Sequence, residues 1–231
     1  MIKPKNTIPL FKVFMSPTAK DKAGEVLDSG YIGQGPKVDE FEKQIGDYFG
    51  NNKVVTTNAG TSALHLALHL LKKPKPHWNE DVFQGVAFVS HNWPGIEDGD
   101  EVLATPLTCT ASNWPIVANN LKIKWVDIDP TTLNMCLKDL EKKMTPKTKA
   151  IMGVHWGGYP LDLDKIRDIR VKFREKNGWA PALIEDGAHA FGSKYKGKYL
   201  GNHNNFVMNS LQAIKHITSV DGGLLYCPHA V

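Results

Sequence analysis

The sequence has few cysteines, no long apolar run and no leader-like N-terminus. Its three cysteines, Cys109, Cys136 and Cys227, lie far apart and form no CxxC pair. This pattern argues against a disulfide framework and is typical of a reducing compartment. No window approaches the roughly 18 consecutive apolar residues of a membrane-spanning helix, and the first residues lack the apolar core of a signal peptide. We therefore expect a cytoplasmic protein that does not span a membrane.

A clustered basic surface is also missing from the sequence. The 231 residues have a formal net charge of +4, but the lysines and arginines are spread along the chain. Nucleic-acid-binding proteins gather such residues into a patch or stripe. A modest positive field suits a small anionic substrate equally well. The sequence therefore predicts no nucleic-acid partner.

Several common site patterns are absent as well. The chain has no GxGxxG after a strand, no GxxxxGK[ST], no HExxH and no GxSxG. His65 and His69 have the spacing of a metal-ligand pair. Two histidines four apart also form one face of an ordinary helix, which is the interpretation we favour, so no metal site is predicted.

Apolar residues make up 42% of the chain, and they form short runs that alternate with helical patterns. Strands are expected at 53–57, 101–105, 122–127, 149–154, 181–184, 206–208 and 223–226. Helices are expected between them at 60–71, 109–118, 135–143 and 163–176. This alternation predicts an α/β fold with a mostly parallel central sheet flanked by helices. The ligand of such a sheet lies beyond the carboxyl ends of the strands.

The chain is interpreted as one domain over residues 1–231, with two irregular parts. Residues 1–50 form an N-terminal helical segment, with helices expected at 16–28 and 36–48. Residues 73–99 break the strand–helix rhythm with prolines and glycines, and they are interpreted as an insertion.

Three separate segments carry residue types suited to one chemistry. Asn58-Ala59-Gly60-Thr61-Ser62 follows a strand and opens a helix, where free backbone N–H groups and hydroxyls bind phosphate. Asp186 follows an apolar strand, and His189 comes three residues later. Lys215 lies among apolar neighbours, which favour the unprotonated amine that attacks a carbonyl.

Taken singly, each segment has an ordinary structural explanation. The first can be a plain capped helix start, Asp186 can cap a turn, His189 can be structural, and Lys215 can be a solvated loop lysine. Together, a phosphate cradle, an acid and a lysine are the parts that hold pyridoxal phosphate (PLP).

Seven segments in the right order resemble one known family. They are residues 30–42, 58–68, 99–102, 126–129, 154–160, 185–192 and 210–223. Together they resemble the DegT/StrS sugar-nucleotide aminotransferases, and they imply the large domain of a fold-type I PLP-dependent transferase. The presence of Lys215 argues against the branch of this family in which histidine replaces lysine and the enzyme dehydrates its substrate.

The resemblance implies a role for each site residue. Lys215 would hold the cofactor covalently and move protons, Asp186 would pair with the ring nitrogen, and His189 would lie near the ring oxygen. Cofactor contacts are implied for Gly60, Thr61, Ser62, Cys109, Asp186, His189, Ser210, Gln212 and Lys215. Thr61, Ser62 and Ser210 would hold the phosphate.

The implied reaction moves an amino group in two halves. Glutamate or glutamine would give its amine to PLP, and a keto-sugar nucleotide of the 4-keto-6-deoxy type would receive it, as in amino-sugar and polysaccharide biosynthesis. Tyr31, Gly33 and Gln34 would lie near this substrate. The family also implies a homodimer with the site at the subunit interface.

Two features depart from the family pattern. Cys109 stands where members commonly place an aromatic residue on the cofactor ring, and cysteine covers less of a ring. Members also continue into a C-terminal small domain, and because the last residue here is Val231 we expect this chain to lack it. A truncated, split or inactive enzyme is therefore an open interpretation.

Two other functions remain as alternatives. A non-catalytic protein of the same fold would bind sugar nucleotides as a sensor or scaffold, although the retained Lys215 and Asp186 favour an enzyme. Another fold-type I enzyme acting on amino acids ranks lower, since it would lack the Gly33-Gln34-Gly35-Pro36 signature.

Overall fold

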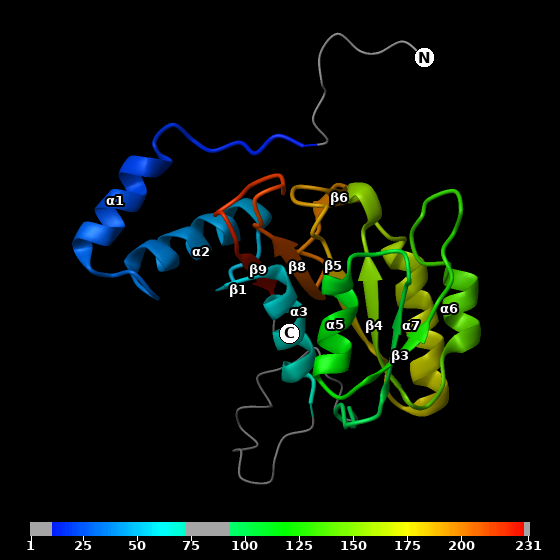
Figure 1. The fold of residues 1–231 in the computed structure, drawn as a ribbon. Coiled ribbons are helices and arrows are strands. Elements are labelled where there is room, and N and C mark those ends of the chain that lie inside the picture. The colour runs from blue at the N-terminus through cyan, green and yellow to red at the C-terminus, as the bar shows by residue number, and fades with distance from the viewer. Residues whose placement is uncertain (1–10, 73–92, 229–231) are drawn as a thin grey trace, which may run out of the picture.

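A computed structural model describes residues 11–72 and 93–228 of the chain. Its centre is a seven-stranded sheet with helices on both faces (Figure 1). The strand order is β1 (Val54–Thr57), β9 (Gly223–Tyr226), β8 (Phe206–Ser210), β5 (Ala182–Asp186), β4 (Thr148–Val154), β2 (Glu101–Ala104) and β3 (Lys122–Trp125). Only β9 runs against its neighbours, so the predicted mostly parallel sheet is confirmed.

The helices lie where the periodicity predicts them, within a few residues. They are α1 (Ala19–Ser29), α2 (Pro36–Phe49), α3 (Gly60–Leu70), α5 (Thr110–Ala118), α6 (Leu137–Lys143) and α7 (Leu163–Asn177). The sequence patterns did not predict two short features, the 3-10 turn η1 (Trp156–Gly158) and the hairpin of β6 (Lys194–Tyr195) with β7 (Lys198–Tyr199). No helix of the described residues is long and apolar enough to cross a membrane.

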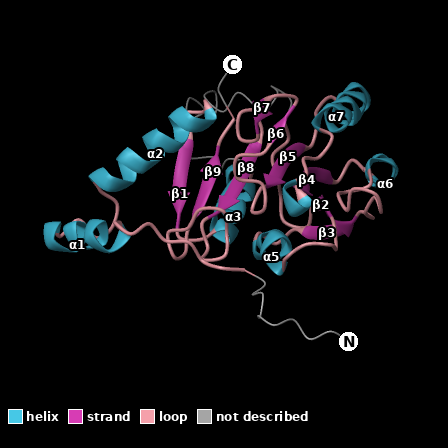
Figure 2. Cartoon of the chain, turned by 90° about the horizontal axis from the view of Figure 1, so that it is seen from above, coloured by secondary structure: helices cyan, strands magenta, loops and turns pink. Residues whose placement is uncertain are grey.

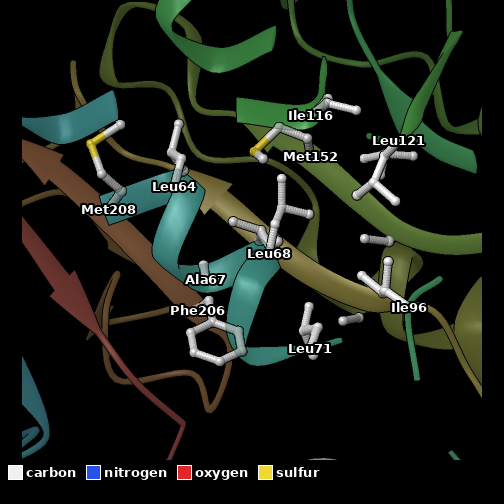
Figure 3. Close-up of a cluster of buried hydrophobic side chains, with 14 of the residues drawn as sticks. Leu64, Ala67, Leu68, Leu71, Ile96, Ile116, Leu121, Met152, Phe206 and Met208 are labelled. Carbon is white, nitrogen blue, oxygen red and sulfur yellow. The ribbon is translucent and has the colours of Figure 1, made fainter. Parts of the chain in front are cut away.

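One face of the sheet is covered by α3 and α5. Leu64 and Leu68 are one helical turn apart on α3 and are fully buried, together with Ile116 of α5 (Figure 3). They pack against strand residues such as Met152 and Phe206. Because alternate strand residues point to the same face, this layer takes every second residue of each strand.

The opposite face is covered by α2, α6 and α7 (Figure 2). Leu140 of α6 and Ile166 of α7 are fully buried over Ile151 of β4. On the same face, Phe49 at the end of α2 packs on Tyr226 of β9, with ring centroids 4.9 Å apart. The core therefore lies on both sides of the sheet, and the strand ends remain for a ligand.

The two helices of the N-terminal segment differ in how firmly they join this core. Helix α1 buries no residue, whereas α2 buries Ile45, Gly46 and Phe49. Of the expected insertion at 73–99, residues 73–92 lie outside the described part of the chain. Lys72 and Ile96, on either side of those residues, pair in a parallel bridge.

Candidate active site

A cavity of about 350 Å³ lies at the carboxyl ends of β4, β5 and β8. Of the expected cofactor residues, those that line it are Gly60, Thr61, Cys109, Asp186, His189, Ser210, Gln212 and Lys215. These residues come from segments that lie far apart in the sequence. The fold therefore gathers most of the expected set at the sheet edge where a parallel sheet binds its ligand.

The start of α3 forms one wall of the cavity. Ala59 is the N-cap residue in an extended conformation, and no described side chain caps the helix. The first N–H groups of α3 are therefore available to an anion, with the helix dipole favouring negative charge. Gly60 permits this placement, because a Cβ atom there would lie 2.8 Å from Sδ of Met208 and 3.2 Å from Cβ of Ser210.

Asp186 forms the buried acidic wall. The strand β5 ends two residues later than expected, and Asp186 is its last residue, with 4% of its surface exposed. Its Oδ2 accepts a hydrogen bond from Ser112 Oγ at 2.5 Å, and its Oδ1 accepts one from the Ala188 N–H at 3.0 Å. These two bonds leave lone pairs of the carboxylate for a donor in the cavity.

Ser112 and Thr108 are site residues that the sequence patterns did not reveal. Ser112 Oγ also shares a hydrogen bond of 2.6 Å with Thr108 Oγ1, and both residues line the cavity. Their only local signal is a pair of hydroxyls four residues apart at the start of the expected helix 109–118. Nothing nearby in sequence shows that this helix turn faces β5.

His189 lies beside Asp186 and Lys215 and is half-buried. Burial lowers the pKa of His189, the nearby Lys215 lowers it further, and Asp186 acts in the opposite direction. Its ring meets the ring of Trp156 edge to face, with centroids 5.6 Å apart. The imidazole is therefore neutral at neutral pH and held in place by its neighbours.

Lys215 follows β8 in a loop and is half-buried. Its backbone N–H donates to the Gln212 carbonyl at 2.9 Å, which holds the loop as a turn. Among the described residues, no acidic side chain forms an ion pair with Lys215. The amine is thus left to a ligand that enters the cavity.

Four expected site residues lie outside the cavity. Ser62 is half-buried on α3 and is not part of the described lining. Tyr31, Gly33 and Gln34 are exposed in the loop between α1 and α2. Their roles therefore stay predictions.

A second cavity of about 370 Å³ lies at the amino ends of β5 and β8. Arg167, Arg170 and Arg174 of α7 line it, and none of the expected cofactor residues does. Burial lowers the pKa of Arg170, and the nearby Glu185 opposes that shift. Size alone therefore does not distinguish the two cavities, but the residues that line them do.

Comparison with known proteins gives concordant matches in sequence and in structure. GDP-perosamine synthase of Escherichia coli O157:H7 is 34% identical over 219 residues, which are 94% of this chain and 52% of that protein. The crystal structure of AtS13 from Actinomadura melliaura superposes with a TM-score of 0.85 at 48% identity, covering 98% of this chain and 55% of that one.

Two further structures have the same fold. The sugar aminotransferase CalS13 from Micromonospora echinospora gives a TM-score of 0.84 at 42% identity, over 96% of this chain and 54% of that one. The E. coli GDP-4-keto-6-deoxy-D-mannose-3-dehydratase with bound hydrated PLP gives 0.79 at 25% identity, over 96% of this chain and 51% of that one. This chain spans about half the length of the proteins that it matches.

The family model that matches the chain covers residues 15–77 and 85–229. The gap at 78–84 falls within the expected insertion. With matches over most of its sequence and structure, the chain belongs to the DegT/DnrJ/EryC1/StrS aminotransferase family.

Proposed function

We propose that this chain binds pyridoxal 5′-phosphate and moves an amino group from glutamate or glutamine to a keto-sugar nucleotide, most simply one of the 4-keto-6-deoxy type. The observation that carries the proposal is the cavity between α3, β5 and β8. It joins an uncapped helix start, a buried carboxylate and a lysine without an ion-pair partner among the described residues.

The donor set of the cavity fits the three polar parts of this cofactor. The N–H groups at the start of α3 and the Ser210 hydroxyl suit a phosphate. The Asp186 carboxylate suits a protonated ring nitrogen, and the Lys215 amine suits an aldehyde. When bound, PLP supplies an electron sink for the amino transfer.

The residues of the chain then have distinct tasks. Asp186, held by Ser112 and Ala188, keeps the proton on the ring nitrogen, because a carboxylate stabilises the adjacent positive charge. Lys215 Nζ accepts a proton from Cα of the amino donor and returns one to the reacting carbon of the sugar. Neutral His189, held edge to face by Trp156, would contact the cofactor ring.

A cofactor titration tests the binding part of this proposal. PLP added to the purified protein is expected to give the visible absorbance band of a lysine-bound aldehyde, and borohydride reduction followed by peptide mass spectrometry should place the label on Lys215. Lys215→Ala should lose both signals. Lys198→Ala, which changes an exposed lysine of β7, should keep them.

The transfer itself is tested with a 4-keto-6-deoxy sugar nucleotide and glutamate or glutamine, with the amino sugar detected by mass spectrometry. Saturable binding of the sugar nucleotide without any PLP band would support the non-catalytic binding protein instead. A protein that binds neither compound would contradict both functions.

We also propose that the working unit is a homodimer. The N-terminal segment exposes several large apolar side chains, including Phe14, Leu27, Tyr31 and Ile32, which are 66 to 78% exposed. Exposed apolar groups of this kind mark interaction surfaces. Sedimentation velocity should show a dimer of the 25.6 kDa chain, and a monomer at assay concentration would contradict it.

A further inference from the structure

His155 is a fully buried histidine with no task in the proposed transfer. It directly follows β4, and its Nδ1 accepts a hydrogen bond from the Leu161 N–H at 3.0 Å. Because Nδ1 is an acceptor, the neutral ring carries its proton on Nε2. Nε2 lies 2.9 Å from Oε2 of Glu185 and donates to it. The ring is therefore fixed at both nitrogens.

His155 is connected to both acidic residues at the end of β5. Its side chain binds Glu185, and its backbone N–H donates to the Asp186 carbonyl at 3.0 Å. The second oxygen of Glu185 accepts from Asn205 Nδ2 at 2.7 Å, just before β8. A ring that cannot turn thus holds the main chain of the residue whose carboxylate faces the cavity.

The same turn supports His189. At Gly158 an added Cβ would lie 2.7 Å from the His189 carbonyl oxygen, so the two backbones are in close contact. Ser193 Oγ donates to the Gly158 carbonyl at 3.0 Å, and Trp156 meets the His189 ring. One turn, residues 155–158, therefore touches both residues beside the cavity.

A fully buried carboxylate is a costly way to join two strands. Apolar pairs of similar volume often give equal or greater stability, whereas a buried carboxylate needs hydrogen-bond donors held in place around it. Glu185 is 0% exposed and sits one residue before Asp186. A small displacement of Glu185 would therefore also move Asp186, the proposed partner of the ring nitrogen.

We infer that His155 is a positioning residue, which together with Glu185 holds the Asp186 carboxylate against the ring nitrogen of the cofactor. The inference rests on the proposed function. It predicts that loss of the His155 side chain weakens PLP binding and changes the protonation of the bound ring, even in protein that remains fully folded.

The test is PLP titration of the folded chain, with circular dichroism confirming the fold at the working temperature. His155→Leu should raise the Kd for PLP about tenfold, which corresponds to about 1.4 kcal/mol. The pH profile of its visible band should shift in the same direction as that of Asp186→Asn. His155→Gln, which keeps an N–H donor for Glu185, should recover most of both effects. His69→Gln, on the exposed end of α3, should match the unaltered protein.

Folded His155→Leu with the Kd and pH profile of the unaltered protein would overturn the inference. If that variant does not fold, His155→Leu/Glu185→Leu removes the unpaired carboxylate as well. The double variant is expected to fold and still bind PLP about tenfold more weakly, and unchanged binding would overturn the inference. Failure of this inference differs from failure of the proposed function, because only the latter shows as absent PLP binding in the unaltered protein.

Discussion

The two faces of β5 carry adjacent carboxylates in opposite surroundings. Asp186 points to the α3 and α5 side, lines the cavity and accepts two hydrogen bonds from the protein. Glu185 points to the other side, where His155 and Asn205 bind its two oxygens. A step of one residue along the strand thus separates an acid that faces a ligand site from an acid that faces only protein.

The difference shows how one strand can serve two purposes. On the Glu185 side, burial is complete and the nearby Arg170 guanidinium favours the negative charge. On the Asp186 side, part of the hydrogen-bonding capacity remains for the cavity. Stability and ligand binding should therefore respond separately to changes at the two residues.

Glu185→Leu should have the largest effect on stability. It leaves the donors of His155 and Asn205 without their acceptor in a buried site, and each unsatisfied donor costs about 1–3 kcal/mol. Urea unfolding of the cofactor-free protein measures this. Glu141→Gln, at an exposed pair with Lys172, is the control and should change the free energy of unfolding by less than about 1 kcal/mol. A similarly small change in the free energy of unfolding of Glu185→Leu would contradict the contrast between the two faces of β5.

Asp186→Asn should change binding more than stability. The amide can still accept from the Ala188 N–H, but it cannot hold a proton on the ring nitrogen as a carboxylate does. We expect PLP binding about 10- to 100-fold weaker, from the loss of a charged hydrogen bond of roughly 1.5–3 kcal/mol. Titration gives the Kd, and urea unfolding of the same preparation gives the stability. If the free energy of unfolding falls as far as in Glu185→Leu while the Kd for PLP is unchanged, Asp186 serves stability and not ligand binding.

Ser112→Ala should give a smaller loss of PLP affinity, about fivefold, because one hydrogen bond of about 1 kcal/mol to Asp186 disappears. Thr131→Ala is a matched control, since its hydroxyl donates to Asp129 at the same distance of 2.5 Å in a hydrogen bond at the surface. The control should leave the Kd unchanged. Equal effects in the two variants would show that Ser112 does not act through Asp186.

The sequence predicted the Asp186 side of this contrast far better than the Glu185 side. An acid after an apolar strand, a helix start and a lysine are local patterns, and the cavity brings these segments together. The burial of Glu185 depends on His155 and Asn205, which are 30 and 20 residues away in the chain. Strand periodicity indicates that neighbours face opposite sides, but it does not indicate which side is closed.

Ser112 was missed for the same physical reason, and the substrate loop stays a prediction. Ser112 is on α5, 74 residues from Asp186, and only packing of α3 and α5 on one face of the sheet brings the two together. The loop with Tyr31, Gly33 and Gln34 was expected near the substrate from family resemblance alone. It is exposed in the described chain, and its role depends on contacts that no local pattern specifies.

The smallest expected effect is a pH dependence that comes from the Asp186 side. Burial and Lys215 lower the pKa of His189 below its ordinary value of 6.5. As the pH falls through 6.5, the unfolded chain therefore binds a proton before the folded chain does, and stability is lost between that pH and the lower folded pKa. Above this window the histidine is neutral in both states and contributes no slope. In cofactor-free protein, the Tm of His189→Gln should fall less than the Tm of the unaltered chain when the pH is lowered from about 7.5 to about 5.5. The exposed His69→Gln should keep the full slope, so identical slopes in all three proteins would show that His189 does not respond to its charged neighbours.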